Sequence, residues 1–231
     1  MFTKTDAIIL HLTRFKDNSD ILHLYTRDYG RVNFIIYGIG GKKSTLSKAV
    51  LAPLNMIEIE AHFDKNDNIQ RINKQSVNLI YAPHNTTILQ DTQRLFIAET
   101  LFKILIHPLA DGNLYDLLEQ QVRTLENADA DWHLRLMVKL MLSLGIIPLL
   151  DLPPTRLNML TGEMSRFTPD NIDHFDTEET FCLQQIANDD KLSLSRTQRQ
   201  TLLRKLCRYY EIHIDGFTTP RSLDILQEVF D

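Results

Sequence analysis

A glycine-rich segment with two adjacent lysines offers the clearest chemistry in this chain. Residues Gly38–Ser44 read GIGGKKS and directly follow a run of strand-forming residues. Glycine lets the main chain approach a ligand closely because it carries no Cβ, and lysine ammonium groups neutralise phosphate charge. We therefore predict that Lys42 and Lys43 contact a nucleic-acid backbone. A solvated turn is the alternative.

Three further residues extend this candidate site. Arg31 and Lys48 lie close to the loop in sequence and add positive charge. Tyr37 stands at the edge of the loop, where its ring could stack on an unpaired base. Phe34 shares a strand face with two aliphatic residues, so we expect it in the core instead.

The motifs of common enzymes are absent from the sequence. It lacks the glycine spacing of dinucleotide and P-loop sites and the serine motif of a nucleophile elbow. Its eight histidines are scattered. Cys182 and Cys207 have no CxxC companion, which argues against a disulfide framework and a zinc site. We expect a protein that is not an enzyme and that uses no cofactor and no metal.

The net charge of −5 conceals an asymmetry along the chain. Residues 1–78 contain 11 Lys and Arg against 8 Asp and Glu, whereas the remainder contains 14 against 22. A basic first part and an acidic second part suggest two modules with different partners. Chance scatter of charge is the alternative.

Nothing in the sequence predicts a membrane protein. The first residues lack the long apolar core of a signal peptide. The most apolar later segment, Leu134–Leu150, is interrupted by charged residues, a glycine and a proline, so it does not predict a membrane span. We expect a cytoplasmic protein.

Periodicity divides the chain near residue 80. Residues 1–80 contain short strand-like runs separated by turn residues. Five strands in about 75 residues favour a small barrel such as an OB-fold. The predicted strands are residues 7–12, 21–26, 31–37, 57–63 and 69–79.

Residues 81–231 show the period of amphipathic helices. Ser195 begins a predicted capping box with Gln198, and Ser222 is predicted to cap the last helix. The predicted helices are residues 86–106, 114–125, 132–144, 177–187, 196–210 and 223–230. Residues 151–176 form an irregular insert. The fold class is thus α+β, with a five-stranded OB-fold barrel followed by a mainly α-helical domain.

A second basic segment lies toward the C-terminus. Residues 191–210 contain six Lys and Arg and no acidic residue. They form either a solvated helix face or a surface for a polyanion or an acidic peptide. Arg204 and Arg208 are the candidate partner-binding residues in this segment.

Six segments spread over nearly the whole chain carry a family resemblance. They are Thr5–Leu10, Asp17–Leu22, Leu24–Gly30, Gly38–Ser44, Tyr209–Ile214 and Arg221–Leu226. Together they resemble the RecO family of bacterial recombination mediators. The resemblance implies an OB-fold followed by a helical domain. It also implies binding of single- and double-stranded DNA, annealing of complementary strands, and a location with the bacterial nucleoid.

The resemblance further implies protein partners. These are RecR and the single-stranded-DNA-binding protein, and together they let RecA load at gaps. Family members often carry a basic residue beside an apolar groove in the helix that here contains Arg135. Such a groove could hold the acidic tail of the single-stranded-DNA-binding protein, with Leu136 and Leu140 as its wall and Arg135 and Lys139 at its edges. Plain helix packing is the alternative.

One departure from the family concerns zinc. Many members carry a cysteine zinc module after the third helix, but residues 152–181 contain no cysteine. We therefore predict no zinc and a hairpin that turns at Thr161–Glu163. An alternative function is a protein-interaction scaffold whose OB barrel is vestigial.

Overall fold

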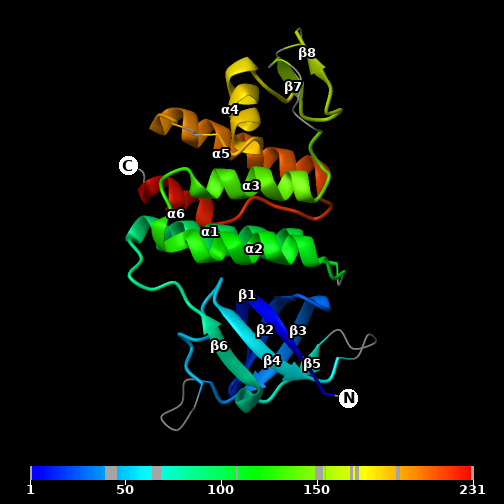
Figure 1. The fold of residues 1–231 in the computed structure, drawn as a ribbon, viewed down its shortest axis with the longest axis vertical. Coiled ribbons are helices and arrows are strands. Elements are labelled where there is room, and N and C mark those ends of the chain that lie inside the picture. The colour runs from blue at the N-terminus through cyan, green and yellow to red at the C-terminus, as the bar shows by residue number, and fades with distance from the viewer. Residues whose placement is uncertain are drawn as a thin grey trace. The chain divides into compact units, whose positions relative to one another are not determined.

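The structure is a computed structural model that describes residues 2–39, 46–63, 69–107, 109–148, 153, 155–166, 169, 172–190 and 193–229. Two compact units, residues 1–127 and 128–231, make up the chain. The first unit combines a curled sheet with two helices, and the second is mainly helical (Figure 1). The α+β class is confirmed. The predicted domain boundary near residue 80 lies within the first unit and stays a prediction.

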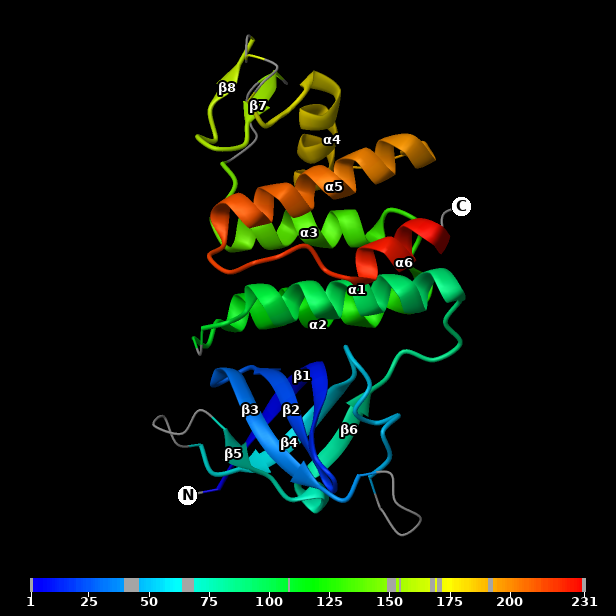
Figure 2. The ribbon, with the colours of Figure 1, turned by 180° about the vertical axis from the view of Figure 1, so that it is seen from behind.

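Six strands form the curled sheet of the first unit (Figures 1 and 2). Their order is β5-β3-β2-β1-β4-β6. The long first strand pairs with β4 through its first half and with β2 through its second half. The strands are β1 (Thr3–Lys16), β2 (Ser19–Thr26), β3 (Gly30–Tyr37), β4 (Met56–Ala61), β5 (Gln70–Arg71) and β6 (Val77–Tyr81).

The prediction of one fifth strand over residues 69–79 is wrong in one respect. The segment forms two strands, β5 and β6, separated by the 3₁₀ turn η1 (Lys74–Ser76). β5 runs parallel to β3, whereas β6 runs antiparallel to β4. Because β5 pairs with β3 and β6 pairs with β4, one continuous strand could not form both pairings. Consecutive strands therefore occupy the two ends of the sheet order, as in an OB-like barrel.

Alternate side chains of the strands fill the inside of the curled sheet. This follows from the two-residue period of a strand, which places every second side chain on one face. Phe34 is fully buried there, as predicted. Leu46 and Leu51, from the segment after β3, complete the cluster. The core residues from the strands are Ala7, Ile9, Leu22, Leu24, Phe34, Ile36, Ile57, Ile59, Ala61 and Val77.

Two helices complete the first unit. α1 (Ile88–Ile104) packs against β1, and α2 (Gly112–Thr124) lies beside it (Figure 2). Thr87 and Gln90 form a capping box at the start of α1, and the Asp111 carboxylate accepts two main-chain N–H groups at the start of α2. These caps satisfy amide groups that have no partner within the helix. Both helices begin within two residues of their predicted positions.

Four helices form most of the second unit. α3 packs against α4 and α5, and α4 matches its predicted bounds. The Ser195–Gln198 capping box is confirmed. Ser222 is the first residue of its helix, so its prediction as a cap is wrong. The helices are α3 (Trp132–Ser143), α4 (Thr177–Ala187), α5 (Arg196–His213) and α6 (Ser222–Val229).

The insert predicted to be irregular contains a small three-stranded sheet. Its strands are β7 (Arg156–Asn158), β8 (Met164–Ser165) and β9 (His174–Phe175), in the order β8-β7-β9. The predicted hairpin turn is confirmed, because β7 and β8 pair on either side of it. Gly162 adopts a φ of 72° there, which favours glycine.

No helix in the described part of the chain is long and apolar enough to cross a membrane.

Candidate nucleic-acid interface

A row of residues crosses the sheet from β1 to β3. Lys16 pairs with Ser19, and Ser19 pairs with Tyr37. Ile36 points into the core, so its neighbour Tyr37 points to the outer face. Adjacent strands lie about 4.8 Å apart, which places the main chain of Lys16 about 10 Å from that of Tyr37.

The two aromatic rings of this region are open to solvent. Tyr37 is 50% exposed and Phe15 is 46% exposed. The Lys16 ammonium lies 5.3 Å from the centre of the Phe15 ring, within the range of a cation–π contact. The exposed Phe15 ring beside the Lys16 ammonium provides a stacking face and a phosphate-binding charge in one place.

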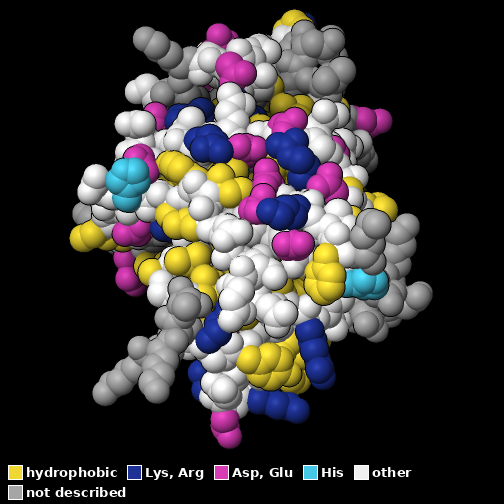
Figure 3. Space-filling model, turned by 60° about the horizontal axis from the view of Figure 1, so that its bottom comes forward, with side chains coloured by type: hydrophobic (Ala, Val, Ile, Leu, Met, Phe, Trp, Pro, Cys, Tyr) yellow, Lys and Arg dark blue, Asp and Glu magenta, His cyan; other side chains and the backbone are white. Residues whose placement is uncertain are grey.

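A second lysine lies near Gly38, the residue after Tyr37. A Cβ placed on Gly38 would lie 3.9 Å from the Lys74 Nζ atom of η1. Lys74 therefore reaches the main chain directly after Tyr37. We call Phe15, Lys16, Tyr37 and Lys74 the Tyr37 surface. Near the lower edge of the space-filling view, Lys and Arg side chains lie beside exposed hydrophobic ones (Figure 3).

The lysines of the glycine-rich loop lie outside the described residues. This applies to both Lys42 and Lys43, whose role stays a prediction. Lys48, farther along, is exposed at a turn in which the Leu51 N–H donates to the Lys48 carbonyl oxygen at 3.1 Å. Buried Leu46 and Leu51 anchor this turn in the barrel core.

Arg31 turns toward α1 instead of the solvent. Its Nη1 atom donates to the carbonyl oxygens of Phe102 and Leu105 at 3.1 and 3.2 Å. The guanidinium also lies 4.5 Å from the Phe102 ring centre. Burial lowers the pKa of Arg31 to about 10. Because Arg31 binds the last carbonyl groups of a helix, we leave it out of the interface proposed below.

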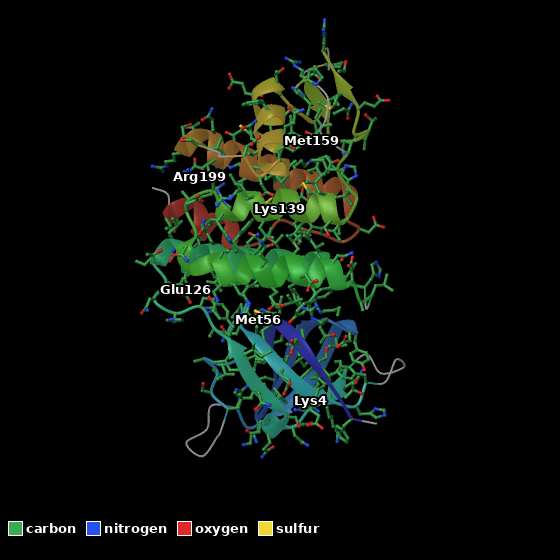
Figure 4. All side chains as sticks on the ribbon, viewed as in Figure 1. Lys4, Met56, Glu126, Lys139, Met159 and Arg199 are labelled. Carbon is green, nitrogen blue, oxygen red and sulfur yellow. The ribbon has the colours of Figure 1, made fainter. Side chains whose placement is uncertain are left out.

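The residues of the predicted helical groove fall into two groups. Leu136 and Leu140 are buried, so they do not line an open groove. Arg135 donates to Asp129 at 2.8 Å, and Lys139, labelled in Figure 4, pairs with Asp189. The cationic edge is present, but each cation already has an acidic partner.

The basic residues of α5 also have partners within the second unit. Arg204 donates to the Gln227 side chain at 3.2 Å, and Arg208 donates to Asp173 at 2.9 Å. That hydrogen bond raises the pKa of Arg208. Arg199, also labelled in Figure 4, lies 2.6 Å from Asp131. Intramolecular pairing therefore uses much of the positive charge of this helix.

Sequence reasoning missed three members of the Tyr37 surface. Phe15 and Lys16 lie beyond residue 12, where the first strand was predicted to end, yet β1 continues to Lys16. Lys74 was counted as a basic residue, but its approach to Gly38 depends on the turn between β5 and β6. The only sequence signal was the unbroken extended character of residues 13–16.

The comparisons with known proteins agree with this architecture. Residues 1–80 match the family model described as Recombination protein O N terminal. The chain is 29% identical to the DNA repair protein RecO of Porphyromonas gingivalis and 28% identical to that of Bacteroides fragilis. It is 27% identical to the DNA repair protein RecO of Flavobacterium psychrophilum, and each of these matches covers 100% of both chains. Over its whole length the chain is therefore similar to the DNA repair proteins RecO.

Proposed function

We propose that this protein is a DNA-binding recombination mediator in DNA repair that acts without covalent chemistry. The observation that carries this proposal is the Tyr37 surface, where an exposed tyrosine shares a row of an OB-like sheet with Lys16 and where Lys74 Nζ lies near the next residue, Gly38. Phosphate groups bind ammonium groups regardless of sequence, and bases stack on exposed rings. Both features suit a protein that binds single strands of any sequence and also contacts duplex phosphates.

Strand annealing follows from the same chemistry. Two complementary strands repel each other through their phosphate charges. A basic surface that neutralises phosphates and releases counterions lowers this repulsion, after which base pairing supplies the driving force. The proposed mechanism therefore needs no catalytic residue, cofactor or metal.

The protein partners of the proposal come from the resemblance to the RecO family. They are RecR, the tail of the single-stranded-DNA-binding protein and, indirectly, RecA, which would load on DNA that this binding protein covers. Arg135, Lys139, Arg204 and Arg208 remain candidate contacts for acidic partners, whereas the buried Leu136 and Leu140 would have to become exposed first. A cytoplasmic protein associated with the nucleoid would fit this role.

Fluorescence anisotropy with a labelled single-stranded oligonucleotide tests the DNA-binding proposal. We expect saturable binding by the wild type at low salt and weaker binding as salt rises. The double variant Lys16→Ala/Lys74→Ala should bind more weakly and show a shallower salt dependence. Tyr37→Leu should weaken single-strand binding more than duplex binding, because only unpaired bases can stack on the ring.

Lys4→Ala is the matched control. Lys4 lies at the other end of β1 and pairs with Glu58 at 3.2 Å (Figure 4). It should leave affinity and salt dependence unchanged. Equal losses of DNA affinity in Lys4→Ala and in Lys16→Ala/Lys74→Ala would reject the Tyr37 surface as the binding site.

A protein-interaction scaffold is the second candidate function. The acidic balance of residues 79–231, with 22 Asp and Glu against 14 Lys and Arg, supports it. Absence of saturable DNA binding at low salt would favour the scaffold over the mediator.

A further inference from the structure

The segment before β4 contains a leucine in an unusual backbone conformation. Leu54 has a φ of 58°, which bulky residues avoid because their Cβ approaches the following carbonyl oxygen. Its side chain is fully buried. Such a conformation persists only where surrounding contacts hold it, and it often occurs at functional sites.

Asn55 supplies several of these contacts. Its side-chain Nδ2 donates to the carbonyl oxygens of Ala49 and Val50, both at 2.9 Å. The Leu54 N–H donates to the Ile9 carbonyl oxygen at 2.7 Å, and the Ile9 N–H donates to the Asn55 carbonyl oxygen at 2.9 Å. One side of the segment is thus bound to β1 and the other to the turn that contains Lys48.

Arg94 of α1 binds the same asparagine. Its Nε atom donates to the Pro53 carbonyl oxygen, and its Nη2 atom donates to Asn55 Oδ1, both at 2.6 Å. A guanidinium can bridge two acceptors in this way because its donors have a fixed, forked arrangement. Met56, which follows Asn55, lies at the end of the sheet nearest α1 (Figure 4).

The contacts continue to the turn of Lys48. The Leu51 N–H donates to the Lys48 carbonyl oxygen at 3.1 Å, and the Ala52 N–H donates to the Ala49 carbonyl oxygen at 3.3 Å. Since Asn55 also binds the Ala49 carbonyl oxygen, the residue after Lys48 is held by two donors. Lys48 itself is exposed. A continuous series of hydrogen bonds thus joins α1 to a basic surface residue.

We propose that Arg94 is a positioning residue for nucleic-acid binding, because through Asn55 it holds the turn that presents Lys48 to a phosphate group. This inference rests on the proposed function. A turn that is already ordered before binding loses less conformational entropy when it meets DNA. Removing Arg94 should therefore reduce the contribution of Lys48 without removing any charge that touches the DNA.

Two measurements on one set of variants test the proposal. The set contains Arg94→Gln, Asn55→Asp, Lys48→Ala and the double variant Arg94→Gln/Lys48→Ala. Asn55→Asp keeps the oxygen that Arg94 binds but removes the donor to the turn. The matched control is Arg123→Gln on α2, whose guanidinium lies 2.9 Å from Glu119 of the same helix. Circular dichroism verifies that each variant is folded.

Hydrogen exchange of the Leu51 and Ala52 amides is the first measurement. Exchange should become faster in Arg94→Gln and in Asn55→Asp but not in Arg123→Gln. Unchanged exchange in both Arg94→Gln and Asn55→Asp overturns the proposal, whether or not the protein binds DNA. Should Arg94→Gln fail to fold, Asn55→Asp carries the test, and Arg94→Lys serves as the conservative replacement.

DNA affinity at low and moderate salt is the second measurement. Single-strand affinity falls when the salt concentration rises from about 50 to about 200 mM. Removing one phosphate contact should make this fall smaller by a factor of roughly 2 to 3. We expect this reduction in Lys48→Ala and Arg94→Gln, and no further reduction in their double variant. Additive effects in the double variant would show that Arg94 acts only on stability. Absence of wild-type binding overturns the proposed function as well.

Discussion

The main chain of Leu109 lies directly against Gly30. A Cβ on Gly30 would stand 2.3 Å from the Leu109 carbonyl oxygen. Gly30 also has a φ of 63°, in the left-handed region that glycine enters readily. This contact joins the turn between β2 and β3 to the segment between α1 and α2, and the absence of a Cβ on residue 30 permits it.

Gly30→Ala should therefore destabilise the protein. The left-handed conformation alone costs an alanine about 1 kcal/mol, and the contact with Leu109 adds to this cost. We expect a loss of at least about 2 kcal/mol in the free energy of unfolding, measured by urea denaturation. Gly216→Ala is the control, since Gly216 has a φ of 76° and nothing within 4 Å of its Cβ position. Equal losses in the two variants would contradict the close contact.

Arg31→Gln should lower stability and leave DNA binding nearly intact. The guanidinium binds two carbonyl oxygens at the end of α1, and losing hydrogen bonds to a charged group costs roughly 1.5 to 3 kcal/mol. Thermal unfolding should show this loss, while anisotropy titrations of folded protein should keep the wild-type salt slope. A shallower slope of log affinity against log salt in Arg31→Gln would show that Arg31 contacts phosphate.

Lys42→Ala/Lys43→Ala should weaken single-strand binding and flatten its salt dependence. This prediction comes from the sequence, where both lysines follow two glycines. Two lost contacts would change the slope of log affinity against log salt by about 1.4 for single strands. Lys139→Ala is the control, because Lys139 pairs with Asp189 in the second unit. Unchanged affinity and slope in the double variant would reject the loop as a phosphate site.

Stability should fall as the pH drops below the ordinary histidine range. Burial lowers the pKa values of His11 and His23, and Arg31 lies near His23. Below a pH of about 6.5 the unfolded chain binds protons that the folded protein does not, so the free energy of unfolding decreases until the folded pKa values are reached. Above that pH, both states hold neutral histidines and the effect vanishes.

His23→Asn tests this dependence. It removes one titrating ring while keeping a polar side chain beside Asn33, which lies 2.7 Å from His23 Nδ1. Urea denaturation between a pH of about 5 and about 7.5 should show a flatter stability profile than the wild type. The exposed His62 offers the control variant His62→Asn, which should keep the wild-type profile. A profile of wild-type steepness in His23→Asn would contradict this origin of the pH dependence.

Metal removal should leave the second unit folded. Its small sheet is held by packing: Leu157 and Phe175 are fully buried, and the Phe175 ring lies 5.9 Å from the Tyr209 ring. Within the described residues, no group of three metal-binding side chains occurs. A chelator should not change the melting temperature. Phe175→Ala should destabilise by roughly 3 to 5 kcal/mol. Stoichiometric zinc in purified protein, or unfolding on its removal, would contradict this account.

Local patterns in the sequence predicted most of the elements. Apolar runs located β2 and β3, alternation of apolar and polar residues located β4, and the capping box of Ser195 with Gln198 located the start of α5. These signals are local, because a strand or a helix period is set by neighbouring residues. The break between β5 and β6 could not be predicted in this way, since it depends on two different pairing partners.

The sequence by itself determined the fold class, the approximate positions of the helices and the resemblance to the RecO family. Only the tertiary structure decided where individual side chains act. It turned Arg31 inward to α1, buried Leu136 and Leu140, aligned Lys16 with Tyr37 across the sheet and placed Lys74 Nζ near Gly38. The physical reason is that strand register and helix packing join residues far apart in the chain, and no local spacing records those contacts.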